Sequence, residues 1–339
     1  MQNPEKNIKL RGSALTNVGR VRSHNEDNIH LWMSDNLLLA IVADGMGGAA
    51  AGEEASRIAV ETIMTQLSIH ETSDEAKIDI PADELSSAVK AANLSIMQEA
   101  IEHPRQRGMG TTLTMVFVRE NVARFAHVGD SRAYLVDVDG HIEQITSDHS
   151  FVQALLDAGH ITEEQAEAHP MSNVLYRALG QTRDLDVDTY SAGLANGDTL
   201  VLCSDGLTRH VRSTEIAEMA TWEDPQEISK SLVDLANSRG GEDNISVIVV
   251  RVEGDSSIAR QIFIDEASLP VDDGDTLKLP NRPQPPSDEN PQDLRASIDM
   301  QRPERRESYD NSDRSESTIS GSGRFDAYNP EGPDRSFPR

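Results

Sequence analysis

Hydrophobic and polar positions alternate in short blocks across the first 254 residues, and the blocks follow two different periods. Short apolar runs rich in β-branched residues predict strands. These runs occupy residues 10–16, 29–33, 37–43, 111–118, 122–127, 132–136, 199–203 and 245–252. Longer patterns with helical spacing predict helices at 52–69, 81–101 and 225–238. Because strands cluster and the first two helices are consecutive, we expect antiparallel sheets covered by helices rather than strict βαβ alternation.

Residues 111–136 contain three strand patterns in succession, interrupted at Glu120-Asn121 and Gly129-Asp130. Short interruptions of this kind are typical of hairpin turns, so the segment is predicted as an antiparallel meander. Residues 149–170 are acid-rich, with helical spacing and little strand character. We predict that they form a lid or flap.

The apolar runs stop near residue 254. Beyond Gly254, isolated apolar residues stand among Pro, Ser, Asp, Glu and Arg. Such a composition buries too little surface to offset the entropy lost on ordering. We therefore predict a folded domain at 8–253 and a disordered tail at 255–339, with a short helix near 258–267.

Net charge and cysteine content narrow the class of protein. The chain of 339 residues carries a formal charge of −27, which disfavours nucleic acid and anionic lipid as partners. Its single cysteine, Cys203, lies in an apolar run and excludes intramolecular disulfides. No apolar stretch has the length of a transmembrane helix. We expect a cytoplasmic protein without nucleic-acid partners or membrane insertion.

Acidic residues stand at the ends of several predicted strands. Asp44-Gly45 and Asp205-Gly206 each follow an apolar run, and Asp243 comes shortly before the last one. Carboxylates fixed at strand ends, together with the free carbonyl of Gly45, are hard oxygen ligands suited to Mg²⁺ or Mn²⁺. An ordinary Asp-Gly turn is the alternative for either pair alone. Two such pairs, with Asp243 and Asp130, favour a metal site.

The segment from Arg22 to Asp27 adds a charged cluster before the second predicted strand. Arg22 offers a planar fork to a phosphate, and Glu26 could hold metal-bound water. A solvated charged turn is the alternative, and His24 has only a weak claim as a proton donor. Residues 45–50 also fit a G-x-G-x-x-A dinucleotide pattern. The adjacent Asp44 disfavours that interpretation, because its charge would oppose a pyrophosphate.

Six short motifs occur in order along the chain at suitable intervals. They are Asn25-Glu26-Asp27, Ala43-Asp44-Gly45-Met46-Gly47-Gly48, Gly110-Thr111-Thr112, His127-Val128-Gly129-Asp130-Ser131-Arg132, Ser204-Asp205-Gly206-Leu207 and Asp243-Asn244. Together they resemble the metal-dependent serine/threonine protein phosphatases of the type 2C (PPM) class, and the bacterial branch most of all. The resemblance extends over roughly residues 8–253.

The resemblance implies an α-β-β-α sandwich, with two antiparallel sheets between helical layers and the metals at one edge. It implies that Asp44 bridges two Mg²⁺ or Mn²⁺ ions and that the Gly45 carbonyl binds one of them. Asp205 and Asp243 would complete the shell of the other ion, and Glu26 would act through water.

The remaining roles follow from the same resemblance. Arg22 would hold the substrate phosphate, Asp130 would serve a third metal site, and residues 148–180 would form the variable flap. Met46 stands where many eukaryotic members have histidine, a proposed general acid. The position of Met46 therefore leaves the donor of the leaving-group proton unassigned, and metal-bound water is the first candidate.

The expected activity is hydrolysis of phosphoserine and phosphothreonine in proteins by water activated between two metal ions. Phosphorylated proteins are the expected partners, together with a cognate serine/threonine kinase whose action the enzyme opposes. Two alternatives remain open: a non-catalytic binding module with the same fold, and a phosphohydrolase acting on small phosphate esters.

Overall fold

The computed structural model describes residues 8–34, 36–68, 78–254 and 262–264. All of them belong to the first of the two units into which the chain divides, Met1–Asp272 and Asp273–Arg339. The predicted tail lies outside the described residues except for 262–264.

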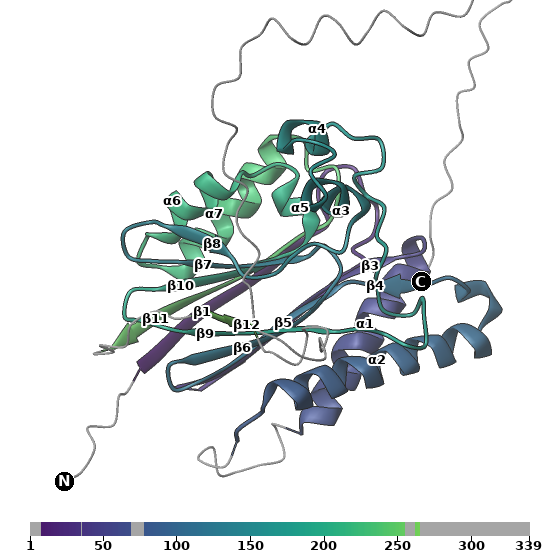
Figure 1. Ribbon diagram of the computed structural model, residues 1–339, viewed down its shortest axis with the longest axis horizontal. Coiled ribbons are helices and arrows are strands. Elements are labelled where there is room, and N and C mark those ends of the chain that lie inside the picture. The colour runs from purple at the N-terminus through teal and green to yellow at the C-terminus, as the bar shows by residue number, and fades with distance from the viewer. Residues whose placement is uncertain (1–7, 35, 69–77, 255–261, 265–339) are drawn as a thin grey trace, which may run out of the picture. The chain divides into compact units, whose positions relative to one another are not determined.

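The described strands form two antiparallel sheets (Figure 1). The first has the order β1 (Ile8–Asn17), β11 (Ile245–Gly254), β10 (Thr199–Cys203), β7 (Arg132–Val136) and β8 (Ile142–Gln144). The second has the order β12 (Ile262–Ile264), β9 (Asp188–Gly193), β6 (Val122–Val128), β5 (Leu113–Arg119), β3 (Leu37–Met46) and β2 (Asp27–Met33), with β4 (Gly110–Thr111) paired to β3. A dinucleotide site of the G-x-G-x-x-A type requires a parallel βαβ unit. Because the described strands pair antiparallel, residues 45–50 do not belong to such a unit.

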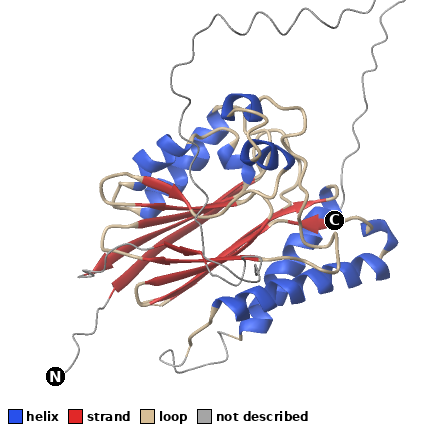
Figure 2. Ribbon diagram, in the orientation of Figure 1, coloured by secondary structure: helices blue, strands red, loops and turns tan. Residues whose placement is uncertain are grey.

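Helices cover the outer faces of both sheets. Those that the structure describes are α1 (Ala49–Leu67), α2 (Ala82–Glu102), the 3₁₀-helix η3 (Pro104–Gln106), α3 (Phe151–Asp157), α4 (Glu163–Glu167), α5 (Asp205–Thr208), α6 (Ser213–Ala220) and α7 (Pro225–Ser238). Figure 2 shows the strands between two groups of helices. Helices α1 and α2 pack on the sheet that contains β3, whereas α6 and α7 pack on the sheet that contains β11. No helix in the described part of the chain is long and apolar enough to cross a bilayer.

Strand β3 shows that its sheet is buried on both faces. Leu39 and Ile41 belong to the core beneath α1 and α2, whereas Leu38 and Ala40 belong to the core between the two sheets. Successive residues of a strand point to opposite faces, so a strand covered on both sides must be apolar at every position. The continuous apolar run of β3 therefore confirms the predicted α-β-β-α sandwich.

The predicted meander over 111–136 is wrong at its third strand. Strands β5 and β6 pair as expected, but β7 pairs with β10 and β8 in the other sheet. The chain therefore crosses from one sheet to the other at Gly129-Asp130-Ser131. This crossing brings Asp130 to the edge where strands of both sheets end.

Further differences concern three other strands. Strand β12 lies at Ile262–Ile264, where the sequence predicted a short helix, and it pairs with β9. Strands β8 and β9 were not predicted, because Ile142–Gln144 and Asp188–Gly193 contain few apolar residues. These short strands are stabilised by pairing with neighbours, which a local pattern does not reveal.

Candidate active site

Strand ends from both sheets enclose a cleft of about 570 Å³. Every residue that the sequence singled out for metal or phosphate binding lines it. These are Arg22, Glu26, Asp44, Gly45, Asp130, Asp205 and Asp243. His24 is exposed and is not among the described residues that line the cleft. Residues separated by more than two hundred positions in the chain thus share one site.

Asp44 stands near the end of β3, and its backbone is fixed on both sides. The Thr112 N–H donates to the Asp44 carbonyl at 2.9 Å, and the Asp44 N–H donates to Thr112 Oγ1 at 3.1 Å. The hydroxyl of Thr111 donates to the same carbonyl at 2.9 Å. The two threonines of the Gly110-Thr111-Thr112 motif therefore fix the backbone of Asp44, a role that the sequence had left unassigned.

Gly45 lies at a close crossing of three chain segments. Its N–H donates to the Glu26 carbonyl at 3.1 Å. A Cβ at this position would stand 2.1 Å from the carbonyl oxygen of Gly52 and 2.6 Å from that of Glu26. Only glycine permits this approach, which brings the first turn of α1 against the segment carrying Glu26.

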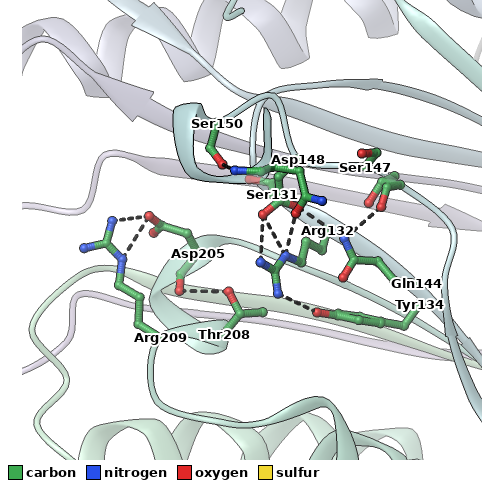
Figure 3. Close-up of polar contacts among 12 residues, drawn as sticks. Ser131, Arg132, Tyr134, Gln144, Ser147, Asp148, Ser150, Asp205, Thr208 and Arg209 are labelled. Carbon is green, nitrogen blue, oxygen red and sulfur yellow. Dashed lines mark hydrogen bonds and ion pairs between the residues drawn. The ribbon is translucent and has the colours of Figure 1, made fainter. Parts of the chain in front are cut away.

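Two arginines pair with the acids of the cleft. Asp205 begins α5, and Arg209, one turn later, approaches its Oδ2 with both Nε, at 3.0 Å, and a terminal nitrogen (Figure 3). Arg22 places a terminal nitrogen 2.9 Å from Asp243 Oδ2 and another 3.8 Å from Glu26 Oε1. Arg22 is half-exposed at the rim, so its fork faces a site that an anion can enter.

Asp130 is held by the turn that crosses between the sheets. Gly129 has φ +113°, and a Cβ there would stand 2.6 Å from Thr112 Cβ. The hydroxyls of Ser131 and Thr112 are 2.7 Å apart, so the residue after Asp130 is tied to the residue that fixes Asp44. Gly129 thus permits the turn, and Ser131 fixes it to Thr112. Together they hold Asp130 at the cleft.

The charges of the cleft fit a site for divalent cations. Burial, followed by repulsion from Asp27 and Asp205, raises the pKa of Asp44 well above its usual range. Burial and repulsion from Asp205 do the same to the pKa of Asp130. Buried like charges oppose one another's ionisation. A bound divalent cation would relieve that repulsion, and the all-oxygen donor set suits Mg²⁺ or Mn²⁺.

Asp27 is an acid of this region that sequence reasoning did not assign. It lies opposite Asp44 in the β2–β3 register and is buried. Ser204 Oγ donates to its Oδ2 at 2.8 Å, whereas the buried Oδ1 has no hydrogen-bond partner among the described residues. Burial is the main reason that its pKa is raised to about 7. Its position next to Glu26 was the available signal.

A second cluster of acidic and histidine side chains lies outside the cleft. Asp137, Asp139 and His141 have ligand-type atoms within 4.8 Å of one another, but they lie on the turn between β7 and β8. Asp137 Oδ1 accepts the backbone N–H groups of Asp139 and His141 at 2.9 and 2.8 Å. The turn's own hydrogen bonds therefore account for this cluster.

The predicted flap, residues 148–180, adjoins the cleft. Asp148 is its first residue and accepts two hydrogen bonds from Arg132, at 2.9 Å from Nε to Oδ1 and at 2.7 Å from Nη2 to Oδ2 (Figure 3). The helical segments α3 and α4 lie within it. The segment after α4 brings Leu175, Tyr176 and Arg177 to the cleft wall, so the flap supplies part of the site's lining.

Comparison with known proteins places these features in a family. The family described as Protein phosphatase 2C matches residues 18–238. The serine/threonine phosphatase stp of Listeria monocytogenes is 39% identical over 242 residues, which make up 69% of this chain and 93% of that protein.

Solved structures agree with the sequence comparison. The Mycobacterium tuberculosis serine/threonine phosphatase PstP/Ppp superposes with a TM-score of 0.65 at 38% identity, covering 72% of this chain and 99% of that one. The catalytic domain of the serine/threonine protein phosphatase PstP in complex with two manganese ions gives 0.63 at 35% identity, covering 73% and 99%. With its sandwich fold and acid-lined cleft, the chain belongs to the protein phosphatase 2C family.

Proposed function

We propose that this protein is a Mg²⁺- or Mn²⁺-dependent phosphatase that hydrolyses phosphoserine and phosphothreonine in proteins. The observation that carries the proposal is the convergence of Arg22 and all the predicted acids on one cleft. The serine/threonine phosphatase names of the relatives, and the two manganese ions of one of them, support it.

Different residues of the cleft are proposed to bind different metal ions. Asp44 would hold two ions, the Gly45 carbonyl would bind one of them, and Glu26 would act through water. Asp205 and Asp243 would complete the shell of the other ion. Asp130 would serve a third site. Such ions, when bound, make coordinated water more acidic and offset charge on phosphoryl oxygens.

Arg22 is the proposed phosphate-binding residue. Its guanidinium is half-exposed and pairs with Asp243 and Glu26, two acids that line the cleft. A planar fork of this kind can hold two phosphoryl oxygens while the phosphorus passes from the serine or threonine oxygen to water. Met46 lines the cleft but has no proton to donate, so its side chain does not serve as the general acid.

The proposed reaction also defines the partners. Phosphorylated proteins are the substrates, and a serine/threonine kinase must supply them because the reaction consumes phosphoserine and phosphothreonine. We place this cycle in the cytoplasm. A non-catalytic binding module is disfavoured, because no predicted acid is missing from the cleft. The names of the relatives give no support to a small-ester phosphohydrolase.

The decisive experiment is release of phosphate from a phosphothreonine peptide with and without Mn²⁺. We expect Mn²⁺-dependent turnover by the wild-type protein and none by Asp44→Asn, because the bridging carboxylate is lost. Asp139→Asn is the matched control, since Asp139 is an exposed acid outside the cleft lining, and it should retain wild-type turnover. Unchanged turnover in Asp44→Asn would refute the proposal.

Calorimetric titration with Mn²⁺ tests the division of roles within the same set of variants. Asp44→Asn should weaken binding at both ions, whereas Asp205→Asn should weaken chiefly one. Equal binding stoichiometry in the two variants would contradict the bridging role of Asp44.

A further inference from the structure

Among the described residues, three arginines line the cleft, and their partners differ. Arg22 pairs with Asp243 and Glu26, and Arg209 pairs with Asp205. Those acids line the cleft and are the proposed metal ligands. Arg177 instead pairs with Asp188, which is not among the described residues lining the cleft. Its orientation is therefore independent of the proposed metal ligands.

Arg177 uses only part of its hydrogen-bonding capacity in this pairing. One terminal nitrogen, Nη1, lies 2.6 Å from Asp188 Oδ1 and 3.1 Å from His149 Nε2, and the guanidinium carbon lies 5.8 Å from the centre of the Tyr176 ring. Within the described part of the chain, Nε and the other terminal nitrogen of Arg177 make no hydrogen bond or ion pair. A quarter of the side chain (25%) is exposed. The guanidinium is thus fixed at one end and available at the other.

The acid that holds Arg177 is itself fixed by a buried histidine. The Gly129 N–H donates to His149 Nδ1 at 3.0 Å, so in the neutral ring Nε2 carries the proton. That Nε2 lies 3.1 Å from Asp188 Oδ2 and donates to it. The hydroxyl of Tyr190 donates to the same oxygen at 3.2 Å. Asp188 is therefore held from three directions.

The charge of this acid is also secured. Burial acts to raise the pKa of Asp188, but the hydrogen bond from His149 and the charge of Arg177 outweigh it and lower the pKa to about 2. The His149 side chain is only 3% exposed, so water does not compete for its hydrogen bonds. Asp188 and His149 are thus positioning residues that hold the guanidinium at the cleft wall without entering the cleft.

We propose that Arg177 binds a second anionic group of the protein substrate, a carboxylate or another phosphate close to the phosphorylated residue being hydrolysed. The inference rests on the proposed function. Arg22 lies with the proposed metal-binding acids and takes the reacting phosphate, whereas Arg177 lies on the flap segment after α4, beside Tyr176. A prepositioned guanidinium loses little freedom on binding a carboxylate or phosphate, with which its planar fork can form paired hydrogen bonds. Arg177 is thus a specificity-determining residue.

The test compares wild type with Arg177→Gln on matched substrates in the presence of Mn²⁺. Three phosphothreonine peptides differ only in the residues flanking the phosphate: alanines, glutamates, or one further phosphoserine. The small ester p-nitrophenyl phosphate is the fourth substrate. Loss of one charged hydrogen-bonding partner predicts KM values roughly tenfold higher for the glutamate and diphosphorylated peptides, with kcat unchanged. The alanine peptide and the small ester should be unaffected.

Two further variants separate binding from folding. Arg177→Lys keeps the charge without the fork and should restore part of the discrimination. Asp188→Asn leaves Arg177 in place but removes the charge that orients it, so KM should rise in the same substrates by a smaller factor. Raised KM for one anionic peptide alone would identify whether carboxylate or phosphate is the group bound.

Other outcomes overturn the inference. Equal KM values for all peptides in the wild type would do so, as would a loss of kcat on every substrate in both Arg177→Gln and Arg177→Lys. Equal losses on p-nitrophenyl phosphate would instead assign Arg177 to the reacting phosphate. If the wild type hydrolyses no phosphopeptide with Mn²⁺, the proposed function itself fails, and this inference with it.

Discussion

At the scale of single residues, the cleft contains acids whose surroundings disfavour ionisation of the carboxyl group. Asp44 and Asp130 are surrounded by other carboxylates and shielded from water, which raises their pKa values. Residue type and position beside strands were sufficient to identify them from sequence. The burial of Asp27, and the pairing of Arg209 with Asp205 one helical turn away, required the structure, because both depend on the direction in which a side chain points.

A buried histidine gives a pH prediction at the same scale. His127 is fully buried, with Nε2 donating to the Ser147 carbonyl at 3.1 Å and Nδ1 2.8 Å from Thr114 Oγ1. Burial lowers its pKa to about 3 from the usual 6.5. Between pH 6.5 and pH 3, His127 is protonated in the unfolded chain but stays neutral in the folded protein. The free energy of unfolding therefore falls as the pH is lowered from 6.5 toward 3.

We expect His127→Gln to flatten this dependence by about 1.4 kcal/mol per pH unit over that range. Denaturant unfolding curves collected between pH 7 and pH 4 measure the slope. His141→Gln is the control, because the His141 side chain is 81% exposed, and it should keep the wild-type slope. An unaltered slope in His127→Gln would show that His127 is protonated in the folded protein.

At the scale of elements, an ion pair fastens the start of the flap to β7. Asp148, with 7% of its side chain exposed, accepts hydrogen bonds from Arg132 and, at 3.2 Å, from Gln144 Nε2 of β8. The sequence predicted strand β7 within its correct bounds but assigned it to the wrong sheet. Sheet membership depends on contacts with β10, which lies more than sixty residues away, and no local pattern encodes such a contact.

Removing one partner of this pair should be costly. Asp148→Ala leaves the guanidinium of Arg132 largely buried without its counter-charge, and we expect a loss of about 2–4 kcal/mol in unfolding free energy. The more exposed pair of Glu54 with Arg57 is the comparison, and Glu54→Ala should cost less than about 1 kcal/mol. Urea unfolding measures both. Similar losses in the two variants would mean that Asp148 contributes no more than a surface acid.

At the scale of the whole molecule, the site belongs entirely to the domain that ends at β11. The residues lining the cleft lie between Arg22 and Asn244. Only β12, at Ile262–Ile264, extends the described structure beyond this domain, and it pairs with β9. The domain boundary at 253 and the nature of the tail remain predictions from composition.

Truncation separates the tail from the edge strand. Deleting residues 265–339 should leave kcat/KM for the phosphothreonine peptide and the melting temperature unchanged. Deleting residues 255–339 also removes β12, exposes the edge of β9, and should lower the melting temperature by about 2–4 °C with catalysis retained. A large loss of turnover in the shorter deletion would show that the tail takes part in catalysis.

The sequence by itself determined the alternating strands, the long helices and the chemical types of the site. These follow from the periodicity of apolar residues and from the preference of carboxylates for hard cations, which are local properties. The tertiary structure alone decided that β7 joins the other sheet, that β12 is a strand, and that His149 and Asp188 hold Arg177 at the cleft. Each of these depends on hydrogen bonds between segments distant in the chain, whose partners are chosen only when the two sheets pack together.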